Sequence, residues 1–531
     1  MKKNFYIYLF VLVAIVLIQS CAVGPNYHKP ETEENTESFR YASKDADSII
    51  NLKWWKIFDD PVLDTLIYKA LANNKNLLIA ASKIEQARAN VGFTNADKGP
   101  KFSYNASGGS TNFPGNSVLD NSVNSFSVST NVSWELDFWG KYRRASEAAK
   151  AELLSSFYGK RAVEIGLISE VATNYFKLLD YRTELEISES TLASRDSTLQ
   201  IIQARFDEGY THIIDVNQAQ IQKAIAQAAV PQFKRFIGFT ENNLSVLLGE
   251  SPDVIRTYTT FDNYKLPDSI PTGLPSEILQ RRPDILQASQ NYHTQNANIG
   301  VAQAMRFPSI SLTGLLGVGS GELSTLLSGG LGWGAAAGIT GPLFEFGKNA
   351  RRVDIAREVA KQSLLTYEFT VLNSMQEVSN ALLEIETLKA ELEARQLQLN
   401  AARNASYLSG KRYYQGVTSY LEVIDSQQKE FQAELAYSDN FQTLLSAHVK
   451  LFKALGGGWV SQEEIDKYAQ QVADEQNVDV STIDKDALYY NSQIVDLELT
   501  DEELTERKAE KKRLRKEERA QKKADRQNKN N

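Results

Sequence analysis

The stretch FSVSTNVSWELDF, residues Phe126–Phe138, carries the clearest pattern in a chain of 531 residues. Apolar and polar side chains alternate along it, a period of two that predicts a β-strand with two unlike faces. An apolar face opposite a polar face is typical of a membrane strand between lipid and a watery lumen, and a soluble β-sandwich is the alternative. The apolar face includes the predicted lipid-facing residues Phe126, Val128, Val132 and Trp134.

Three further segments have strand character: Lys101–Ser110, Ser309–Val318 and the Gly-rich Gly332–Phe344. Tilted strands of about 9–11 residues are long enough to cross a bilayer. Four strands cannot close a barrel, and lipid does not tolerate an open sheet edge. If the strands lie in a membrane, several chains must therefore contribute to one barrel.

The chain also contains an internal repeat. Gly140 and Gly347 lie 207 positions apart, and the same offset relates RFDEGYT at 205–211 to RYYQGVT at 412–418. Upstream the offset is 208, for example between Gly92 and Gly300. A nearly constant offset over so many positions favours a duplication over chance similarity between Ala-rich helices.

Each repeat is predicted to contain a helical stretch, two strands, a long helix and a shorter helix. The long helices, Lys141–Glu208 and Lys348–Gln415, would each extend for about 100 Å at about 1.5 Å per residue. A small globule cannot cover such a helix, whereas a tall tube of paired helices can. An ordinary coiled coil would not explain the strands. The other helical stretches are Pro61–Asp97, Asp215–Leu248, Pro275–Met305 and Glu422–Leu455.

The N-terminus reads as a secretory signal. Lys2 and Lys3 precede the apolar run Phe5–Ile18, which is short for a membrane span. After Gln19, the small residue Ser20 precedes Cys21, which is the only cysteine. We therefore expect lipoprotein processing with lipidation of Cys21, and an ordinary signal peptide with a coincidental cysteine is the alternative.

Composition and motifs argue against several other classes of protein. The formal net charge is -8, whereas nucleic-acid binding usually requires a basic excess. The four histidines have no metal-ligand spacing, and the chain contains no phosphate-binding loop. The sequence therefore predicts no catalytic residue, no metal and no cofactor.

Several blocks resemble the outer membrane factors of the TolC superfamily, in particular the NodT-type lipid-anchored efflux lipoproteins. The resemblance extends over Cys21–Trp459 and is specific because the blocks occur together. They are CAVGPNYHKP at 21–30, LKWWKIFDDPVLDTLIYKALANNKNLLIA at 52–80, SWELDFWGKYRRA at 133–145, RRPDI at 281–285, RFPSISLTG at 306–314, GPLFEFGK at 341–348 and RYYQGVTSYLEVIDSQ at 412–427.

The resemblance implies a mainly α fold with a membrane β part. A homotrimer would form a twelve-stranded β-barrel in the outer membrane, continued by a periplasmic α-helical barrel with an equatorial domain. This trimer would dock a periplasmic adaptor protein and an inner-membrane pump of the resistance-nodulation-division (RND) type, and would passively conduct small molecules. The alternatives are a duct for type I protein secretion and a periplasmic coiled-coil scaffold lipoprotein.

The resemblance also implies that the two turns between long and short helices form the periplasmic tip. Gly209 and Gly416 suit sharp turns, because glycine accepts a positive φ at little cost. Links among Arg, Tyr and acidic residues would close the channel there, and a solvated helix face is the alternative for each of them. The candidates are Arg412, Tyr413, Tyr414, Glu422, Asp425, Arg205 and Asp215.

These expectations divide the chain into six parts. The C-terminal part is rich in Lys, Arg and Glu, and its composition predicts a largely disordered tail. The parts are the signal peptide 1–20, a lipid-anchored segment with part of the equatorial domain 21–60, the first repeat 61–249, an equatorial linker 250–274, the second repeat 275–456 and the tail 457–531.

Overall fold

The computed structural model describes residues 22–30, 54–111, 123–257, 264, 282–328 and 330–457. All of these residues fall within one of the two compact units into which the chain divides. The predicted signal peptide, Cys21 and the charged tail from residue 458 lie outside the described residues.

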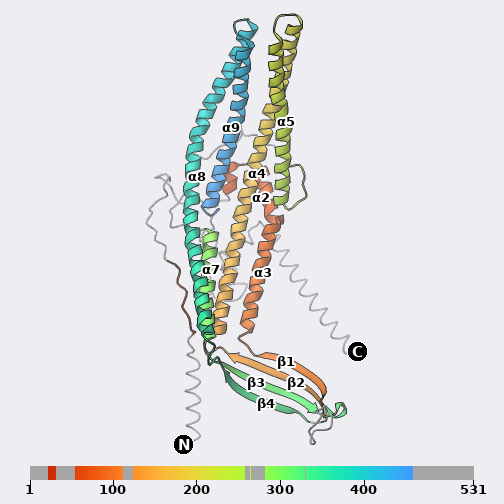
Figure 1. The fold of residues 1–531 in the computed structure, drawn as a ribbon, viewed down its shortest axis with the longest axis vertical. Helices are drawn as coiled ribbons and strands as arrows, with labels where there is room; N and C mark the ends of the chain where they lie inside the picture. Colours follow the sequence, from red (N-terminus) through yellow and green to blue (C-terminus); the bar gives the residue numbers. More distant parts are fainter. Residues whose placement is uncertain are drawn as a thin grey trace, which may run out of the picture. The chain divides into compact units, whose positions relative to one another are not determined.

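The described strands form one antiparallel sheet in the order β1-β2-β3-β4 (Figure 1). Its members are β1 (Lys101–Thr111), β2 (Val123–Leu136), β3 (Ser309–Ser320) and β4 (Gly332–Thr340). The two repeats therefore contribute one hairpin each, and β2 and β3 join the hairpins. The outer strands β1 and β4 each have a free edge within the described part of the chain.

The register of the sheet places apolar residues beside apolar residues. Val132 lies opposite Phe102 on β1, and Trp134 lies opposite Leu312 on β3. Farther across the sheet, Ile310 faces Ile339 on β4. Because side chains alternate along each strand, these positions share one face of the sheet. The other face is mostly polar, and on it the hydroxyls of Ser107 and Ser127 lie 2.8 Å apart.

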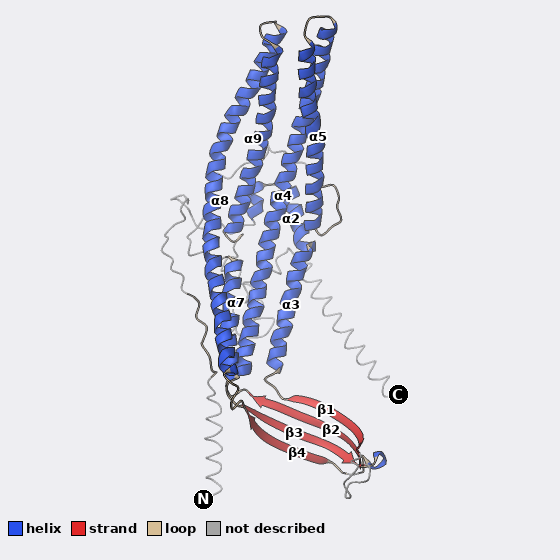
Figure 2. Ribbon diagram, viewed as in Figure 1, coloured by secondary structure: helices blue, strands red, loops and turns tan. Residues whose placement is uncertain are grey.

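Corresponding helices of the two repeats have equal numbers of residues, and Figure 2 shows how these helices are arranged beside the sheet. Helices α4 (Lys141–Asp207) and α8 (Lys348–Tyr414) have 67 residues each, and α5 (Ile213–Leu247) and α9 (Tyr420–Ala454) have 35 each. Helices α3 (Lys75–Ala96) and α7 (Pro283–Ala304) have 22 residues each. The remaining elements are α2 (Pro61–Asn73) and the 3-10 helices η1 (Trp54–Phe58) and η3 (Leu323–Thr325).

The helices form two hairpins that lie side by side. Helix α4 packs along α5 and α3, whereas α8 packs along α9 and α7. Contacts of α4 with α7 and α9 join the two sets. The largest hydrophobic core lies where η1, α2, α4, α5 and α9 meet, and it buries Trp54, Phe58 and Phe176.

The predicted stretch Pro61–Asp97 is two helices rather than one. Asn74 separates them with an extended backbone at φ -60° and ψ 127°. Its side chain accepts a hydrogen bond from the Leu77 N–H and donates one to the Leu247 carbonyl. The break is stabilised by this contact with α5, because Asn74 caps α3 while it holds a distant segment.

Two strands end earlier than expected. β2 ends at Leu136 rather than Phe138, because the Asp137 carboxylate turns to accept hydrogen bonds from the N–H groups of Tyr142 and Arg143 at the start of α4. β4 ends at Thr340 rather than Phe344. Gly341 and Pro342 follow there, and proline has no N–H for a strand ladder.

Within the described ranges, no helix is both long and apolar enough to cross a membrane. The same residues contain no group of three or more His, Cys, Asp or Glu side chains that could hold a metal ion.

Candidate functional site

Two turns of the same geometry end α4 and α8 at the end of the helices remote from the sheet (Figure 1). Gly209 and Gly416 have φ values of +76° and +74°. The next N–H groups, of Tyr210 and Val417, donate to carbonyls five residues back, at 2.7 and 2.9 Å. This is the Schellman pattern of helix ends, and it requires the left-handed conformation that glycine adopts readily.

The second turn joins two of the predicted gate residues. Arg412, in the last turn of α8, places Nη1 2.7 Å from Oε1 of Glu422 in the first turn of α9. The Thr418 hydroxyl donates to the other oxygen of the same carboxylate. Glu422 therefore binds both ends of the turn within one chain.

The two hairpins meet just below their turns. The Arg205 guanidinium from α4 lies over the Tyr413 ring from α8, 5.0 Å from its centroid. Tyr413 also contacts Tyr420, with ring centroids 5.4 Å apart. Burial raises the pKa of Tyr420 to about 12, so its phenol is neutral near pH 7 and contributes packing and hydrogen bonding rather than charge. A cluster around Ile202 and Val216 extends this contact.

The other predicted tip residues have local partners. Asp215 accepts a hydrogen bond from the Thr211 hydroxyl, and Asp425 forms an ion pair of 2.7 Å with Lys429 one turn along α9. Tyr414 is 66% exposed. Within one chain the structure therefore brings together Arg412 with Glu422 and Arg205 with Tyr413, but it does not join Asp215 or Asp425 to an arginine.

Arg195 is a buried contact between the hairpins that sequence reasoning missed. It lies on α4, is 3% exposed, and donates through Nη1 to the Gln222 carbonyl of α5 at 2.7 Å. Nη2 reaches Gln428 of α9 at 3.4 Å, and the guanidinium lies 5.2 Å from the Phe431 centroid. Burial lowers the pKa of Arg195. One cation thus connects three helices below the tip.

A buried cluster of acidic residues was also not predicted from the sequence. Asp180 and Glu184 on α4 are 2% and 8% exposed and lie near Asp439 of α9. Burial raises the pKa of Asp180 to about 7 and that of Glu184 to about 9. The Ser438 hydroxyl donates to Asp180 at 2.5 Å. The only signal in the sequence is an Asp and a Glu four residues apart within the long helix.

The segment after Cys21 is strapped to the start of α4. The Val23 N–H donates to the Trp139 carbonyl at 3.1 Å. Arg144, which is 5% exposed, donates to the Val23 and Gly24 carbonyls and to the Asn26 side chain. We refer to residues 22–27 as the N-terminal strap.

Tyr27 ends the strap against α7. Its hydroxyl lies 2.8 Å from the Ser289 hydroxyl, and its ring stacks on His293 with centroids 4.1 Å apart. His293 in turn lies 3.1 Å from Glu147, which is also held by Arg144. These pairings hold the pKa of Glu147 below its usual range despite partial burial, which acts in the opposite direction.

Gly24 and Gly300 allow the strap to pack closely against α7. A Cβ on Gly300 would lie 2.8 Å from Arg144 Cγ and 2.9 Å from the Val23 carbonyl oxygen. Gly24 has a φ of +109°, and a Cβ there would lie 2.5 Å from Gly300 Cα. The backbones of the strap and α7 can touch only because both positions lack a side chain.

The sequence is similar to those of known outer membrane efflux proteins. The family model described as outer membrane efflux protein matches residues 66–250 and 274–457. The cation efflux system protein CusC of Escherichia coli O6:H1 is 32% identical over 452 residues, which cover 84% of this chain and 97% of that protein. The probable outer membrane lipoprotein SilC of Salmonella typhimurium is 30% identical over 461 residues, covering 86% of this chain and 100% of that protein.

Solved structures agree with the sequence matches. The Campylobacter jejuni CmeC outer membrane channel superposes with a TM-score of 0.78 at 27% identity, covering 87% of this chain and 100% of that one. The sheet and the helical hairpins described above are therefore the architecture of a TolC-like outer membrane channel.

Proposed function

The chain belongs to the outer membrane efflux protein family, and on that premise we propose that three copies assemble into a passive duct for small molecules. The protein is an outer membrane component of an efflux system that extends into the periplasm. The proposal assigns the transport energy to an inner-membrane pump and no catalytic step to any residue of this chain.

The observation that carries the proposal is the sheet with one apolar face and two free edges. An open edge in lipid would leave N–H and C=O groups without partners, at a cost of several kcal/mol for each group. Pairing β4 of one copy with β1 of the next would remove every edge. Three copies would then supply twelve strands, with Phe126, Val128, Val132 and Trp134 toward lipid and the serine-rich face toward the lumen.

The two turns suit docking of a periplasmic adaptor. Four apolar side chains at the turns are more than half exposed: Ile213, Ile214, Val417 and Leu421. Exposed apolar side chains gathered at one end of a helical hairpin are typical of an interaction surface. We assign the adaptor to this end, and beyond it an RND-type pump, since relatives carry the names of efflux pump and cation efflux proteins.

The contacts below the turns suit a gate. The Arg412–Glu422 pair is exposed and weak, whereas Arg205 and Tyr413 join the two hairpins of one protomer. Weak links of this kind can keep a narrow tip closed and still allow it to open. Tyr414, Asp215 and Asp425 remain candidates for contacts between protomers.

The strap supports a lipid anchor at Cys21. Because Val23 is bound to Trp139, between the end of β2 and the start of α4, a lipid on the preceding residues would lie at the level of the sheet's helical end. Cys21 itself is outside the described residues, and its acylation is part of the proposal.

Accumulation of dyes, antibiotics and bile-like detergents in cells that lack this gene tests the transport function. The expected result is higher accumulation, reversed by the intact chain but not by a chain without residues 126–138. Unchanged accumulation across the whole panel would count against small-molecule efflux and favour secretion of a protein.

A pair of neighbouring substitutions tests the assignment of the sheet faces. Val132→Arg places a cation on the apolar face, which costs about 2–4 kcal/mol near the middle of a bilayer. Asn131→Arg places the same side chain on the polar face. We expect only the first variant to be lost from the outer membrane fraction, and equal insertion of both would refute the assigned faces.

A further inference from the structure

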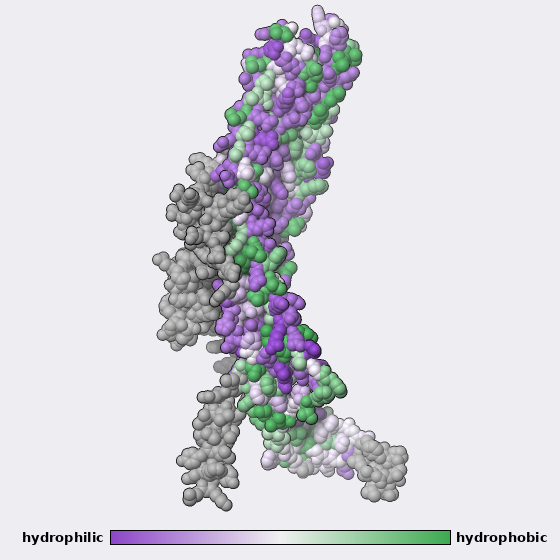
Figure 3. Space-filling model, turned by 60° about the vertical axis from the view of Figure 1, so that its left-hand side comes forward, coloured by the Kyte–Doolittle hydropathy of each residue, from purple (hydrophilic) through white to green (hydrophobic). Residues whose placement is uncertain are grey.

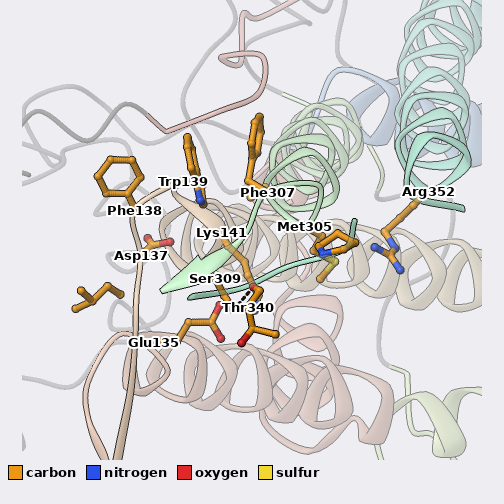
Figure 4. Close-up of a pocket in the computed structure, with 13 residues that line it drawn as sticks. Glu135, Asp137, Phe138, Trp139, Lys141, Met305, Phe307, Ser309, Thr340 and Arg352 are labelled. Carbon is orange, nitrogen blue, oxygen red and sulfur yellow. Dashed lines mark hydrogen bonds and ion pairs between the residues drawn. The ribbon is translucent and has the colours of Figure 1, made fainter. Parts of the chain in front are cut away.

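A pocket of about 280 Å³ lies where the sheet meets the helices (Figure 4). Its walls come from the ends of β2 and β4, the start of β3, the end of α7 and the first turns of α4 and α8. Every lining residue belongs to the described part of the chain. The pocket is remote from the turns and is not used by the proposed gate.

One wall of the pocket is aromatic. Trp139 and Phe307 stack with centroids 4.4 Å apart and an interplanar angle of 19°, and Phe138 meets Trp139 edge-on at 4.9 Å. The Trp139 indole N–H donates to the Pro308 carbonyl at 2.8 Å, which fixes the ring. Phe307 and the neighbouring Met305 are 40% and 39% exposed. The protein thus holds a rigid apolar surface partly open to its surroundings.

The opposite wall is charged, and its carboxylates are already satisfied. Glu135 accepts hydrogen bonds from Lys141 and Tyr142, at 3.0 and 2.9 Å. Asp137 accepts from Arg143 and from the start of α4. These acids therefore need no further cation.

Arg352 differs from the other charged residues of this wall in its partner. It enters the pocket from α8, and its hydrogen bond is to the Asn349 side chain at 2.6 Å. Among the described residues it has no carboxylate partner. Arg351, one position earlier, is 82% exposed and already pairs with Asp354 at 3.1 Å. A guanidinium that lacks an acidic partner beside an apolar surface is suited to a bidentate anion such as a phosphodiester.

The position of the pocket indicates which molecule would supply that anion. On the face shown in Figure 3, hydrophobic residues gather where the helices meet the sheet, whereas hydrophilic residues predominate over the upper helices. Tryptophan and basic side chains concentrate at the level of lipid headgroups in membrane proteins. If the sheet lies in the membrane, its helical end is at the headgroups of the leaflet that faces the periplasm.

We propose that this pocket binds the phosphodiester headgroup of a glycerophospholipid, with Arg352 on the phosphate and an acyl chain against Trp139 and Phe307. The volume is just below the range of about 300–1,000 Å³ usual for small-molecule sites. It is sufficient for the headgroup and the first methylenes but not for two whole chains, which continue along the apolar face of the sheet. The inference rests on the proposed function only for the place of the sheet in the membrane.

The test uses the full-length protein, delipidated in detergent and kept as the assembled complex. Native mass spectrometry measures binding of palmitoyl-oleoyl phosphatidylglycerol, of the corresponding diacylglycerol without phosphate, and of inorganic phosphate alone. We expect Arg352→Gln to weaken phosphatidylglycerol binding roughly tenfold, because a charge-assisted bidentate contact is lost. Arg351→Gln is the matched control and should bind like the unaltered protein. Arg352→Lys keeps the charge without the planar fork and should fall between the two.

Each other outcome decides against the site. Equal binding by Arg352→Gln and Arg351→Gln would remove Arg352 from lipid recognition, as would equal affinity for diacylglycerol and phosphatidylglycerol. Displacement of the lipid by millimolar inorganic phosphate would identify an anion site rather than a lipid site. Size-exclusion chromatography of each variant confirms assembly, and efflux measured separately distinguishes failure of the lipid site from failure of the channel function.

Discussion

Arg412 Nη1 and Glu422 Oε1 lie 2.7 Å apart and connect the end of α8 to the first turn of α9. The pair links the two helices on either side of the turn at Gly416, within one protomer. The two side chains are 52% and 38% exposed, and exposed ion pairs contribute only about 0–1 kcal/mol. The link can therefore break without unfolding the hairpin, as a gate requires.

Replacing Arg412 with serine should raise the single-channel conductance in planar bilayers. The substitution frees the Glu422 carboxylate and loosens the start of α9 at the proposed gate. Arg403→Ser is the matched control, since Arg403 forms a comparable 2.8 Å pair between α8 and α9 with Glu434. Conductance that rises equally in both variants, or in neither, would take Arg412 out of the gate.

The free energy of unfolding should fall as the pH rises from about 5 to 8. Burial raises the pKa of Asp180 to about 7 and that of Glu184 to about 9, whereas both carboxyls titrate near pH 4 in an unfolded chain. Between those values the folded state holds more protons than the unfolded state, so added base favours unfolding. Each extra proton held corresponds to about 1.4 kcal/mol per pH unit.

Glu184→Gln should flatten this dependence and raise the thermal midpoint at pH 8. Glu186→Gln, on an exposed position of the same helix, should leave the dependence as it is. The measurement is the unfolding midpoint of the assembled protein at several pH values. An unchanged slope in Glu184→Gln would mean that the buried cluster does not titrate in this range.

Most of the fold follows from the sequence because its elements are long and strongly patterned. The helix beginning at Lys141 is predicted to end at Glu208 and ends at Asp207. The strand from Lys101 is longer than expected by one residue. The break at Asn74 is harder to predict, because the Leu247 carbonyl that holds its side chain is 173 positions away.

The site is less predictable than the fold. Gly416 and Arg412 can be recognised from their place at a turn. The partner of each charged residue, however, depends on how each helix is rotated about its own axis, which the sequence does not show. Asp425 illustrates this, because it pairs with Lys429 on its own helix rather than with an arginine across the turn. Arg195 was missed because nothing in its local sequence distinguishes a buried arginine from the exposed ones around it. The roles of the tip residues and the domain boundaries stay predictions.

Gly416→Ala should loosen the tip, whereas Gly410→Ala should tighten it. Gly416 has a φ of +74°, and alanine in that conformation costs about 1–2 kcal/mol. Gly410 lies inside α8, and alanine there should stabilise the helix by about 0.5–1 kcal/mol, because nothing lies within 4 Å of a Cβ at that position. Hydrogen exchange of peptides covering residues 405–425 should be faster in the first variant and slower in the second. The same direction in both would contradict the turn's need for glycine.

Gly300→Ala should release the N-terminal strap. The new methyl group would lie within 3 Å of both Arg144 Cγ and the Val23 carbonyl oxygen. Gly92, the counterpart of Gly300 in the other repeat, has nothing within 4 Å, so Gly92→Ala is the matched control. We expect faster hydrogen exchange at residues 22–27 only in Gly300→Ala. Equal protection in both variants would show that the strap does not depend on this close approach.

The matching lengths of α4 with α8 and of α5 with α9 restrict how this protein can evolve. One residue added to a helix turns everything beyond it by about 100° and shifts it by about 1.5 Å. A single insertion in α8 would carry Tyr413 away from Arg205 of α4 and leave the two tips at different heights. Changes in helix length are therefore tolerable only as whole pairs of turns, about seven residues, made together in all four helices. Single-residue insertions and deletions should instead accumulate in the connections between strands.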